Sequence, residues 1–253
     1  MDFLGTPGVS ALAFFGLSAM SFVTAFIGVF TGGAGGLILL ATMAMVMPTA
    51  ALIPVHTVIQ LGSGITRTII MWRHVMRGTL LPFVIGAGIG AAAGARIVVA
   101  LPTAWLLFFL GVFILTVTWM PNFGRVGAER HRFAVLGFAT TFLGMFVSAT
   151  GSLLLPFVAA AAPSRHNHVA TVGALMMISH IAKIAAFGFI GFAIGSYLPL
   201  MGAMILTGAA GNWLGELALD RTSERRFRLI LRILLTVLGV RLLWSAAVEA
   251  GWL

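Results

Sequence analysis

The chain has no cysteine and few charged residues. Without cysteine, its 253 residues can form no disulfide, no cysteine-ligated zinc site and no iron–sulfur cluster. Charged residues make up 8% of the chain, whereas a soluble domain carries roughly 25%. Only six residues are acidic, and they do not cluster as a metal site requires. This lack of charge excludes an ordinary water-soluble fold, and we expect no bound metal or cofactor.

Long apolar stretches take the place of the missing charge. Hydrophobic residues make up 60% of the chain, and the mean hydropathy is +1.10. The stretches are long and do not alternate, which favours helices that cross a bilayer. Ten segments can be distinguished, at about 9–30, 35–47, 50–72, 79–99, 104–120, 133–147, 152–162, 168–190, 197–217 and 227–248. We therefore predict an all-α polytopic membrane protein, whose second and seventh segments are short for a span of about 20 residues.

The sequence contains two copies of one unit. Residues 26–37, FIGVFTGGAGGL, recur 116 positions later as FLGMFVSATGSL at 142–153, with Phe, Gly, Phe, Gly and Leu in register. Each copy holds about five apolar segments. We therefore predict two membrane repeats, over 1–120 and 133–253, joined by a cytoplasmic linker at 121–132.

Arginine is unevenly distributed over the predicted loops. The third, fifth, seventh and ninth loops carry arginine, and the other loops have none. Basic loops stay on the cytoplasmic side of a membrane, so we place those four loops inside and both termini outside. The basic loop 73–78 of copy one corresponds to the uncharged loop 191–196 of copy two. We therefore predict inverted repeats, as in many secondary transporters.

Two features of this topology stay open. The short segments of each copy either cross the bilayer or enter and leave it on one side. A parallel arrangement of four helices per half is the alternative to inversion, with each glycine-broken pair forming one long bent helix.

A run of glycines or small residues interrupts each copy near its start. These residues are Gly32, Gly33, Gly35 and Gly36 in copy one and Thr150, Gly151 and Ser152 in copy two. A helix that starts near Gly35 directs its free N–H groups and its positive end at the break, where an anion can bind. Close helix packing through small residues is the structural alternative. We favour binding because the breaks recur at matching positions.

A polar stripe that ends in a cation runs along the third segment. Its residues, His56, Gln60, Ser63 and Arg67, are spaced four, three and four apart, which places them on one face of a helix. A charge inside the membrane normally faces protein or water. The alternative for Arg67 is a long side chain that reaches the headgroups.

The second copy carries a corresponding cation. The same offset of 116 pairs Ser63 with Ser179 and Arg67 with Lys183, and His180 follows Ser179. Two cations related by a pseudo-two-fold axis would form one positive site near the middle of the membrane. Arginine can hold an oxyanion through two hydrogen bonds, and lysine adds a mobile point charge.

Other polar and small residues support narrower expectations. Because histidine titrates near neutral pH, His56 and His180 could couple transport to protons; a neutral histidine with a hydrogen bond inside the bundle is the structural alternative.

Asn212 and Glu216 form a polar turn on the ninth segment. Glycines at every fourth position form predicted packing faces, at Gly86, Gly90 and Gly94 and at Gly211 and Gly215.

Four motifs stand out, GGAGG and RGTLLPFVIGAGIGAAAGARI in the first copy and SATGSLLLP and ATVGALMMISHIAK in the second. They resemble those of the sulfite and organosulfonate exporter family, also called TauE/SafE-like or the toluene-sulfonate uptake permease family. The resemblance spans nearly the whole chain. It implies a secondary carrier for sulfite, sulfonates or related small anions in a bacterial plasma membrane.

The sequence lacks the motifs of common enzymes and of ATP-driven pumps. It contains no G-x-S-x-G, no H-E-x-x-H and no P-loop, so we expect neither catalysis nor ATP binding by this chain. The net charge of +9 comes from arginines in short loops, so we expect no nucleic-acid partner. We predict a bilayer-embedded exporter of sulfite or an organosulfonate that works by alternating access, with protons as the candidate coupling ion. An anion channel, or an uptake permease for another small anion, is the alternative.

Overall fold

The described part of the chain is helical. A computed structural model describes residues 2–31, 35–98, 102–119, 129–147, 150–189, 195–218 and 224–252, and these residues form α-helices and short 3-10 helices without a strand. The α-helices are α1 (Ala11–Thr31), α2 (Gly35–Met43), α3 (Thr49–Ile70), α4 (Leu80–Val98), α5 (Thr103–Trp119), α6 (Glu129–Val147), α7 (Gly151–Ala161), α8 (Arg165–Phe189), α9 (Leu198–Ala218) and α10 (Glu224–Glu249). The all-α prediction is confirmed.

The helices follow the apolar segments that the sequence predicts. Among the described residues, three stretches are long and apolar enough to cross a bilayer, namely Ala11–Val29, Arg77–Ile97 and Arg165–Gly188. The α2 and α7 helices have 9 and 11 residues, which is less than the roughly 20 that a full crossing needs. Both short segments are therefore confirmed as short. The first part of the predicted linker, 121–128, lies outside the described residues, and α6 begins at Glu129.

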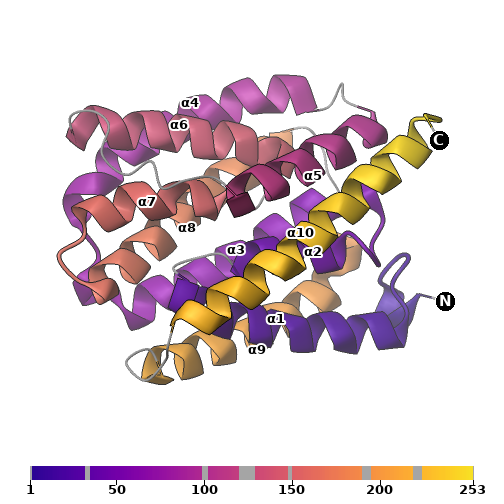
Figure 1. The fold of residues 1–253 in the computed structure, drawn as a ribbon, viewed down its shortest axis with the longest axis horizontal. Coiled ribbons are helices and arrows are strands. Elements are labelled where there is room, and N and C mark those ends of the chain that lie inside the picture. Colours follow the sequence, from indigo (N-terminus) through magenta and orange to yellow (C-terminus); the bar gives the residue numbers. More distant parts are fainter. Residues whose placement is uncertain are drawn as a thin grey trace.

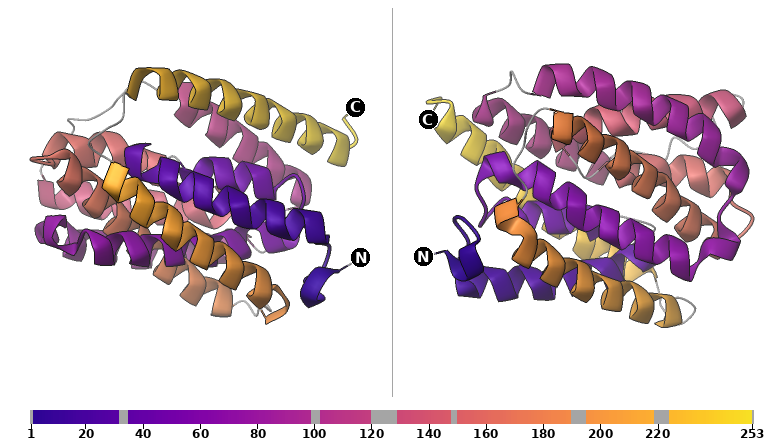
Figure 2. Two further views of the ribbon diagram at one scale, coloured as in Figure 1. Left: turned by 90° about the horizontal axis from the view of Figure 1, so that it is seen from below. Right: turned by 180° about the vertical axis from the view of Figure 1, so that it is seen from behind.

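The helices pack in pairs that take one helix from each half of the chain. The α3 and α8 helices pack against each other at the centre of the bundle, α1 packs against α9, and α4 against α6. Figure 1 shows α4 and α6 along one edge of the molecule and α1 and α9 along the other. The α5 and α10 helices form a further pair that lies across the bundle (Figure 2). Residues from both halves therefore meet along α3 and α8.

The start of each short helix lies beside the helix before it. A Cβ atom on Gly35, the first residue of α2, would lie 3.1 Å from the Cα atom of Gly28 in α1. In one continuous helix, seven residues would separate these positions by about 10 Å. In the second half, Thr150 donates a hydrogen bond of 2.8 Å from Oγ1 to the carbonyl of Thr140 in α6. The chain therefore reverses direction between α1 and α2 and between α6 and α7.

The two termini lie at one end of the bundle (Figures 1 and 2). The hydroxyl of Tyr197, in the 3-10 helix η4 (Gly195–Tyr197), donates a hydrogen bond of 3.3 Å to the carbonyl of Pro7. Pro48, just before α3, lies against Gly8 at the same end. The start of α3 and the start of α9 are thus both close to the N-terminal segment.

The opposite end of α3 contacts the start of α8. The 22 residues of α3 carry the chain about 33 Å away from Pro48. There, Asn167 donates a hydrogen bond of 2.8 Å from Nδ2 to the carbonyl of His74, and the rings of His74 and His166 are 5.2 Å apart. The loop after α3 and the loop before α8 therefore share one end of the molecule, away from the termini.

The predicted glycine faces are confirmed as packing faces. A Cβ atom on Gly86 of α4 would overlap the carbonyl oxygen of Ala134 in α6, and one on Gly90 would lie 2.5 Å from the carbonyl oxygen of Phe138. In the second half, a Cβ atom on Gly211 would overlap the carbonyl oxygen of Phe22 in α1. Only glycine lets these backbones approach so closely, as is common between membrane helices.

We predict that Gly86→Ala destabilises the protein and that Gly88→Ala, on the same helix, does not. The added methyl at position 86 would meet backbone atoms of α6, whereas position 88 has no heavy atom within 4 Å. We expect Gly86→Ala to lower the free energy of unfolding by about 1–3 kcal/mol. The measurement is the thermal-unfolding midpoint of the purified protein in detergent. Equal midpoints for the two variants would contradict the packing of α4 on α6.

Candidate functional site: a polar cavity between the halves

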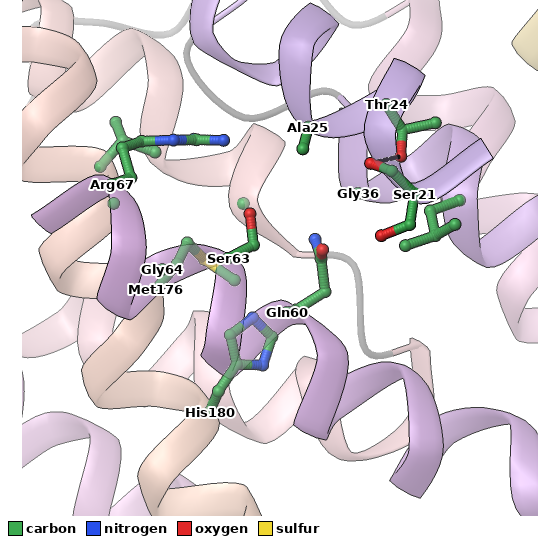
Figure 3. Close-up of a pocket in the computed structure, with 14 residues that line it drawn as sticks. Ser21, Thr24, Ala25, Gly36, Gln60, Ser63, Gly64, Arg67, Met176 and His180 are labelled. Atoms are coloured by element: carbon green, nitrogen blue, oxygen red, sulfur yellow. Dashed lines mark hydrogen bonds between the residues drawn. The ribbon is translucent and has the colours of Figure 1, made fainter. Parts of the chain in front are cut away.

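A small polar cavity lies beside α3 and α8. Its wall combines α1, α2 and α3 of the first half with α7 and α8 of the second. The cavity volume is about 40 Å³, which is room for roughly three water molecules. Leu39, Val172 and Met176 supply apolar parts of the wall, and hydroxyl, amide, guanidinium and imidazole groups supply the rest. Figure 3 shows Gln60 and Ser63 between Arg67 on one side and Ser21 and Thr24 on the other.

The cavity brings together many of the residues that the sequence predicts. Those that line it are Gly36, Gln60, Ser63, Arg67, Gly151 and His180. Others are buried but are not part of this lining, namely Gly35, His56, Thr150, Ser179 and Lys183. Gly32, Gly33 and the side chain of Ser152 lie outside the described part of the structure. Both small-residue breaks and the polar stripe of α3 therefore contribute to one cavity.

Arg67 is the cation in the cavity wall. Only 8% of its surface is exposed, and Nη2 donates a hydrogen bond of 3.1 Å to Oδ1 of Asn212. Its Nε atom is buried and has no hydrogen-bond partner. The guanidinium thus faces the interior of the bundle, and its bonded partner is a neutral amide. This position differs from that of a side chain that reaches for the headgroups.

Two glycines make room for the Arg67 side chain. A Cβ atom on Gly28 of α1 would lie 2.9 Å from Nη2 of Arg67, and one on Gly173 of α8 would lie 3.0 Å from its Cδ. Larger residues at either position would push the guanidinium out of its place. The position of Arg67 therefore depends on helices from both halves.

The second half repeats this arrangement around Lys183. A Cβ atom on Gly144 of α6 would lie 3.3 Å from Nζ of Lys183 and 3.2 Å from Oγ1 of Thr150. Gly144 follows Gly28 by 116 positions, the same offset that separates Lys183 from Arg67. Lys183 is the single lysine of the sequence and is fully buried. Each half thus places a cation of its third helix against a glycine of its first helix.

The starts of α2 and α7 lie at the cavity. Gly36 in the first turn of α2 and Gly151, the first residue of α7, are both part of the wall. The first N–H groups of a helix have no partner within the helix, and its N-terminus carries a partial positive charge. A helix that begins at Gly35 is what the sequence predicts, and this start is confirmed. The cavity is therefore electropositive from two directions besides Arg67.

The two predicted histidines have different surroundings. His56 is fully buried, and its Nε2 lies 3.0 Å from the carbonyl oxygen of Gly36, which accepts a hydrogen bond from it. This is the structural alternative that the sequence allows for His56. His180 lines the cavity with 1% of its surface exposed, and its Nδ1 is buried without a hydrogen-bond partner. Of the two histidines, only His180 is part of the cavity wall.

Three polar residues of the site are missing from the predictions. Ser21 and Thr24 of α1 line the cavity, and Asn212 of α9 contacts Arg67. Ser21 and Thr24 are uncharged and lie within an apolar segment, so their helical spacing from Gly28 is the only signal for them. The sequence places Asn212 with Glu216 in a polar turn, and it does not by itself bring α9 next to α3.

Comparison with known proteins gives one match. Residues 17–242 match the protein-family model described as sulfite exporter TauE/SafE. Searches of curated proteins and of solved structures give no match. The matched range includes all of the residues that line the cavity, and it confirms the resemblance that the sequence motifs indicate.

Proposed function

The chain belongs to the sulfite exporter TauE/SafE family, a family of membrane transporters, and from this premise we propose that it exports sulfite or an organosulfonate by alternating access. The proposal places the substrate in the cavity that Arg67 lines. It also places the protein in the bacterial inner membrane, with both termini external. Protons are the proposed coupling ion.

The observation on which this proposal rests is that the Arg67 side chain is buried and only partly hydrogen-bonded. A guanidinium that is almost fully removed from water is costly unless an anion or several hydrogen bonds compensate for it. Asn212 satisfies one Nη2 donor, and the buried Nε has no partner. Both atoms belong to a group that can hold an oxyanion through two hydrogen bonds. A small oxyanion in the cavity would complete the bonding of this cation.

The helix pairing supports two repeats, over 1–120 and 133–253, that are related by a two-fold axis. If the halves exchange, α1 is replaced by α6 and α4 by α9. The pair of α1 and α9 then becomes the pair of α6 and α4, and both pairs are present. The central pair of α3 and α8 and the pair of α5 and α10 each exchange into themselves. Such symmetry allows the two halves to rock around one site at their interface.

Corresponding loops of the two copies lie at opposite ends of the molecule, which supports opposite orientations of the two halves. The loop after α3 lies beside the start of α8, away from the termini, whereas η4 lies beside the N-terminal segment. The first of these is the loop at 73–78, and η4 includes Gly195 and Ser196 of the corresponding loop of copy two. The reversals between α1 and α2 and between α6 and α7 speak against one long bent helix in each half.

We predict that equivalent loops of the two halves react from opposite sides of the membrane. Because the protein has no cysteine, single cysteines at Gly78 and Ser196 can be labelled without background. We expect Gly78→Cys to react only after the membrane is opened and Ser196→Cys to react from outside in intact cells, with a membrane-impermeant maleimide as the probe. Labelling of both positions from the same side would refute inverted repeats.

Transport itself is tested by flux into liposomes that contain the purified protein. Sulfite, sulfoacetate, taurine and sulfate are compared with and without a pH gradient. We expect saturable transport of sulfite or a sulfonate that a pH gradient accelerates, because the imidazole of His180 lines the cavity and can carry a proton. Flux that rises linearly with concentration would favour an anion channel. Flux driven only in the inward direction would favour an uptake permease.

A further inference from the structure

We infer that Asn212 is the residue that positions Arg67 for the substrate and keeps its charge available to it. Asn212 lies on α9, outside the cavity wall, and contacts the guanidinium through Oδ1 at 3.1 Å. This inference rests on the proposed function, because it assigns a task to Arg67 in anion binding. Asn212 is thus a positioning residue that acts through Arg67.

The orientation of the Asn212 amide is fixed by its second set of bonds. Its Nδ2 donates to the carbonyl oxygen of Ser63 at 3.1 Å and to Oγ of Ser63 at 3.0 Å. A carbonyl oxygen only accepts hydrogen bonds, so the NH₂ group must face Ser63 and Oδ1 must face Arg67. Asn212 is 1% exposed, so water does not compete for these bonds. The amide therefore holds Arg67 and Ser63 of the polar stripe in one arrangement.

The α9 helix holds this amide rigidly. Next to Asn212, Gly211 packs backbone to backbone against Phe22 of α1. About one turn earlier along α9, Thr207 donates a hydrogen bond of 2.7 Å to the carbonyl of Ser18, and about two turns earlier the carbonyl of Met204 accepts one of 2.6 Å from Ser21. Asn212 thus reaches Arg67 from a helix that is tied to another wall of the cavity.

The Asn212 amide carries no charge, and this leaves the charge of Arg67 available to an anion. A carboxylate at the same position would form an ion pair with Arg67 and compete with the substrate for its charge. Asparagine supplies an oxygen of the same shape without that charge. The guanidinium is then oriented, with Nε unpartnered, and its positive charge remains uncompensated until an anion enters. The acidic residue of α9, Glu216, lies one turn away from Asn212 and is partly exposed.

The second half does not repeat this amide. The offset that pairs Gly94 with Gly211 pairs Ala95 with Asn212. Because alanine has no polar side-chain atom, α4 offers Lys183 no counterpart of the Asn212 amide at this position. The two halves therefore differ at this position, where only Asn212, which bonds to Arg67, supplies a side-chain amide.

The test compares Asn212→Asp with Asn167→Asp in sulfite flux into liposomes. We expect Asn212→Asp to raise the KM for sulfite at least about tenfold, because close charge pairs are worth more than that factor, with a maximal rate within about twofold of the unchanged protein. Asn167 also donates from Nδ2 to a backbone carbonyl, but it lies at the end of the bundle, so the same change there should leave the KM unaltered. Asn212→Ala, which adds no charge, should also raise the KM, by a smaller factor.

A second measurement shows whether position 212 acts through Arg67. Asn212→Asp is made in the unchanged protein and in Arg67→Ala, and the thermal-unfolding midpoints are compared. We expect the carboxylate to lower the midpoint more when Arg67 is absent, because it is then buried without a cation.

The outcomes separate this inference from the proposed function. If Arg67→Ala abolishes transport while both Asn212 variants keep the KM of the unchanged protein, the inference is wrong and the proposed function stands. The inference is also wrong if Asn212→Asp lowers the midpoint equally in the two backgrounds. If Arg67→Ala itself transports normally, the proposed function is wrong.

Discussion

Replacing Arg67 with alanine is expected to lower kcat/KM for sulfite about 100-fold or more. The guanidinium can give the anion two charge-assisted hydrogen bonds, each worth about 1.5 kcal/mol or more, and about 3 kcal/mol corresponds to roughly 100-fold. Arg67→Lys should recover part of this loss, because it keeps the charge and loses the planar fork. The measurement is initial sulfite flux in liposomes over a range of concentrations.

The matched control for this prediction is Arg96→Ala. Arg96 lies in the last turn of α4 and is exposed, so its removal should leave transport within about twofold of the unchanged protein. Thermal unfolding and gel filtration show whether Arg67→Ala is folded. A folded Arg67→Ala protein that transports sulfite as well as Arg96→Ala would contradict a binding role for Arg67.

Replacing Lys183 with methionine is expected to separate stability from transport. An ammonium group that is taken out of water costs several kcal/mol in real proteins, and methionine has a similar length without the charge. Lys183 is fully buried beside Gly144 and Thr150. We therefore expect Lys183→Met to unfold at the same temperature as the unchanged protein or higher, while sulfite flux falls at least about tenfold.

The comparison for this prediction is Arg241→Met, which removes a cation from an exposed position on α10. Its transport should stay near that of the unchanged protein. A purely structural role for Lys183 makes the opposite prediction, namely a lower unfolding temperature and transport in proportion to the folded fraction. Transport by Lys183→Met at the full rate would contradict a role for the Lys183 charge in transport.

The helices could be predicted from the sequence because hydropathy and helix length are local properties. The predicted start at Gly35 agrees with α2, and the predicted end at 47 exceeds it because the chain turns after Met43, ahead of Pro48. At α6 the helix begins at Glu129 rather than at 133. Charged residues in a first helical turn lengthen the helix without lengthening the apolar segment, so hydropathy does not detect them.

The site could be predicted in part. The spacing of residues shows which of them share one face of a helix, but it does not show which helix or cavity that face contacts. The stripe of Gln60, Ser63 and Arg67 does line one cavity. The sequence predicts Lys183 in the same site, and in the structure Lys183 lies one turn beyond His180 without lining this cavity. That difference depends on how α8 is rotated against α3, which arises from packing between distant parts of the chain.

The helix contacts that position Arg67 and Lys183 are hard to predict from the sequence, because they depend on glycines. Gly28, Gly144 and Gly173 matter through the atoms that they lack, since each leaves room for a side chain of another helix. The repeat pairs Gly28 with Gly144, but it does not show which side chain they accommodate, and Gly16 and Gly188 stand in similar apolar sequence although an added methyl group there would have no heavy atom within 4 Å. Their role becomes visible only when Arg67 and Lys183 are seen against them.

The most direct test of the central claim, an anion held between the two halves at Arg67, is a crystal structure with selenite. Selenite is the heavier analogue of sulfite, and its selenium atom is located by anomalous scattering. We predict a selenium peak in the cavity between Gly36 and Gly151, with a selenite oxygen within hydrogen-bonding distance of the Arg67 guanidinium. A cavity without selenium in crystals of a protein that transports selenite, or a peak at a site remote from Arg67, would contradict this account.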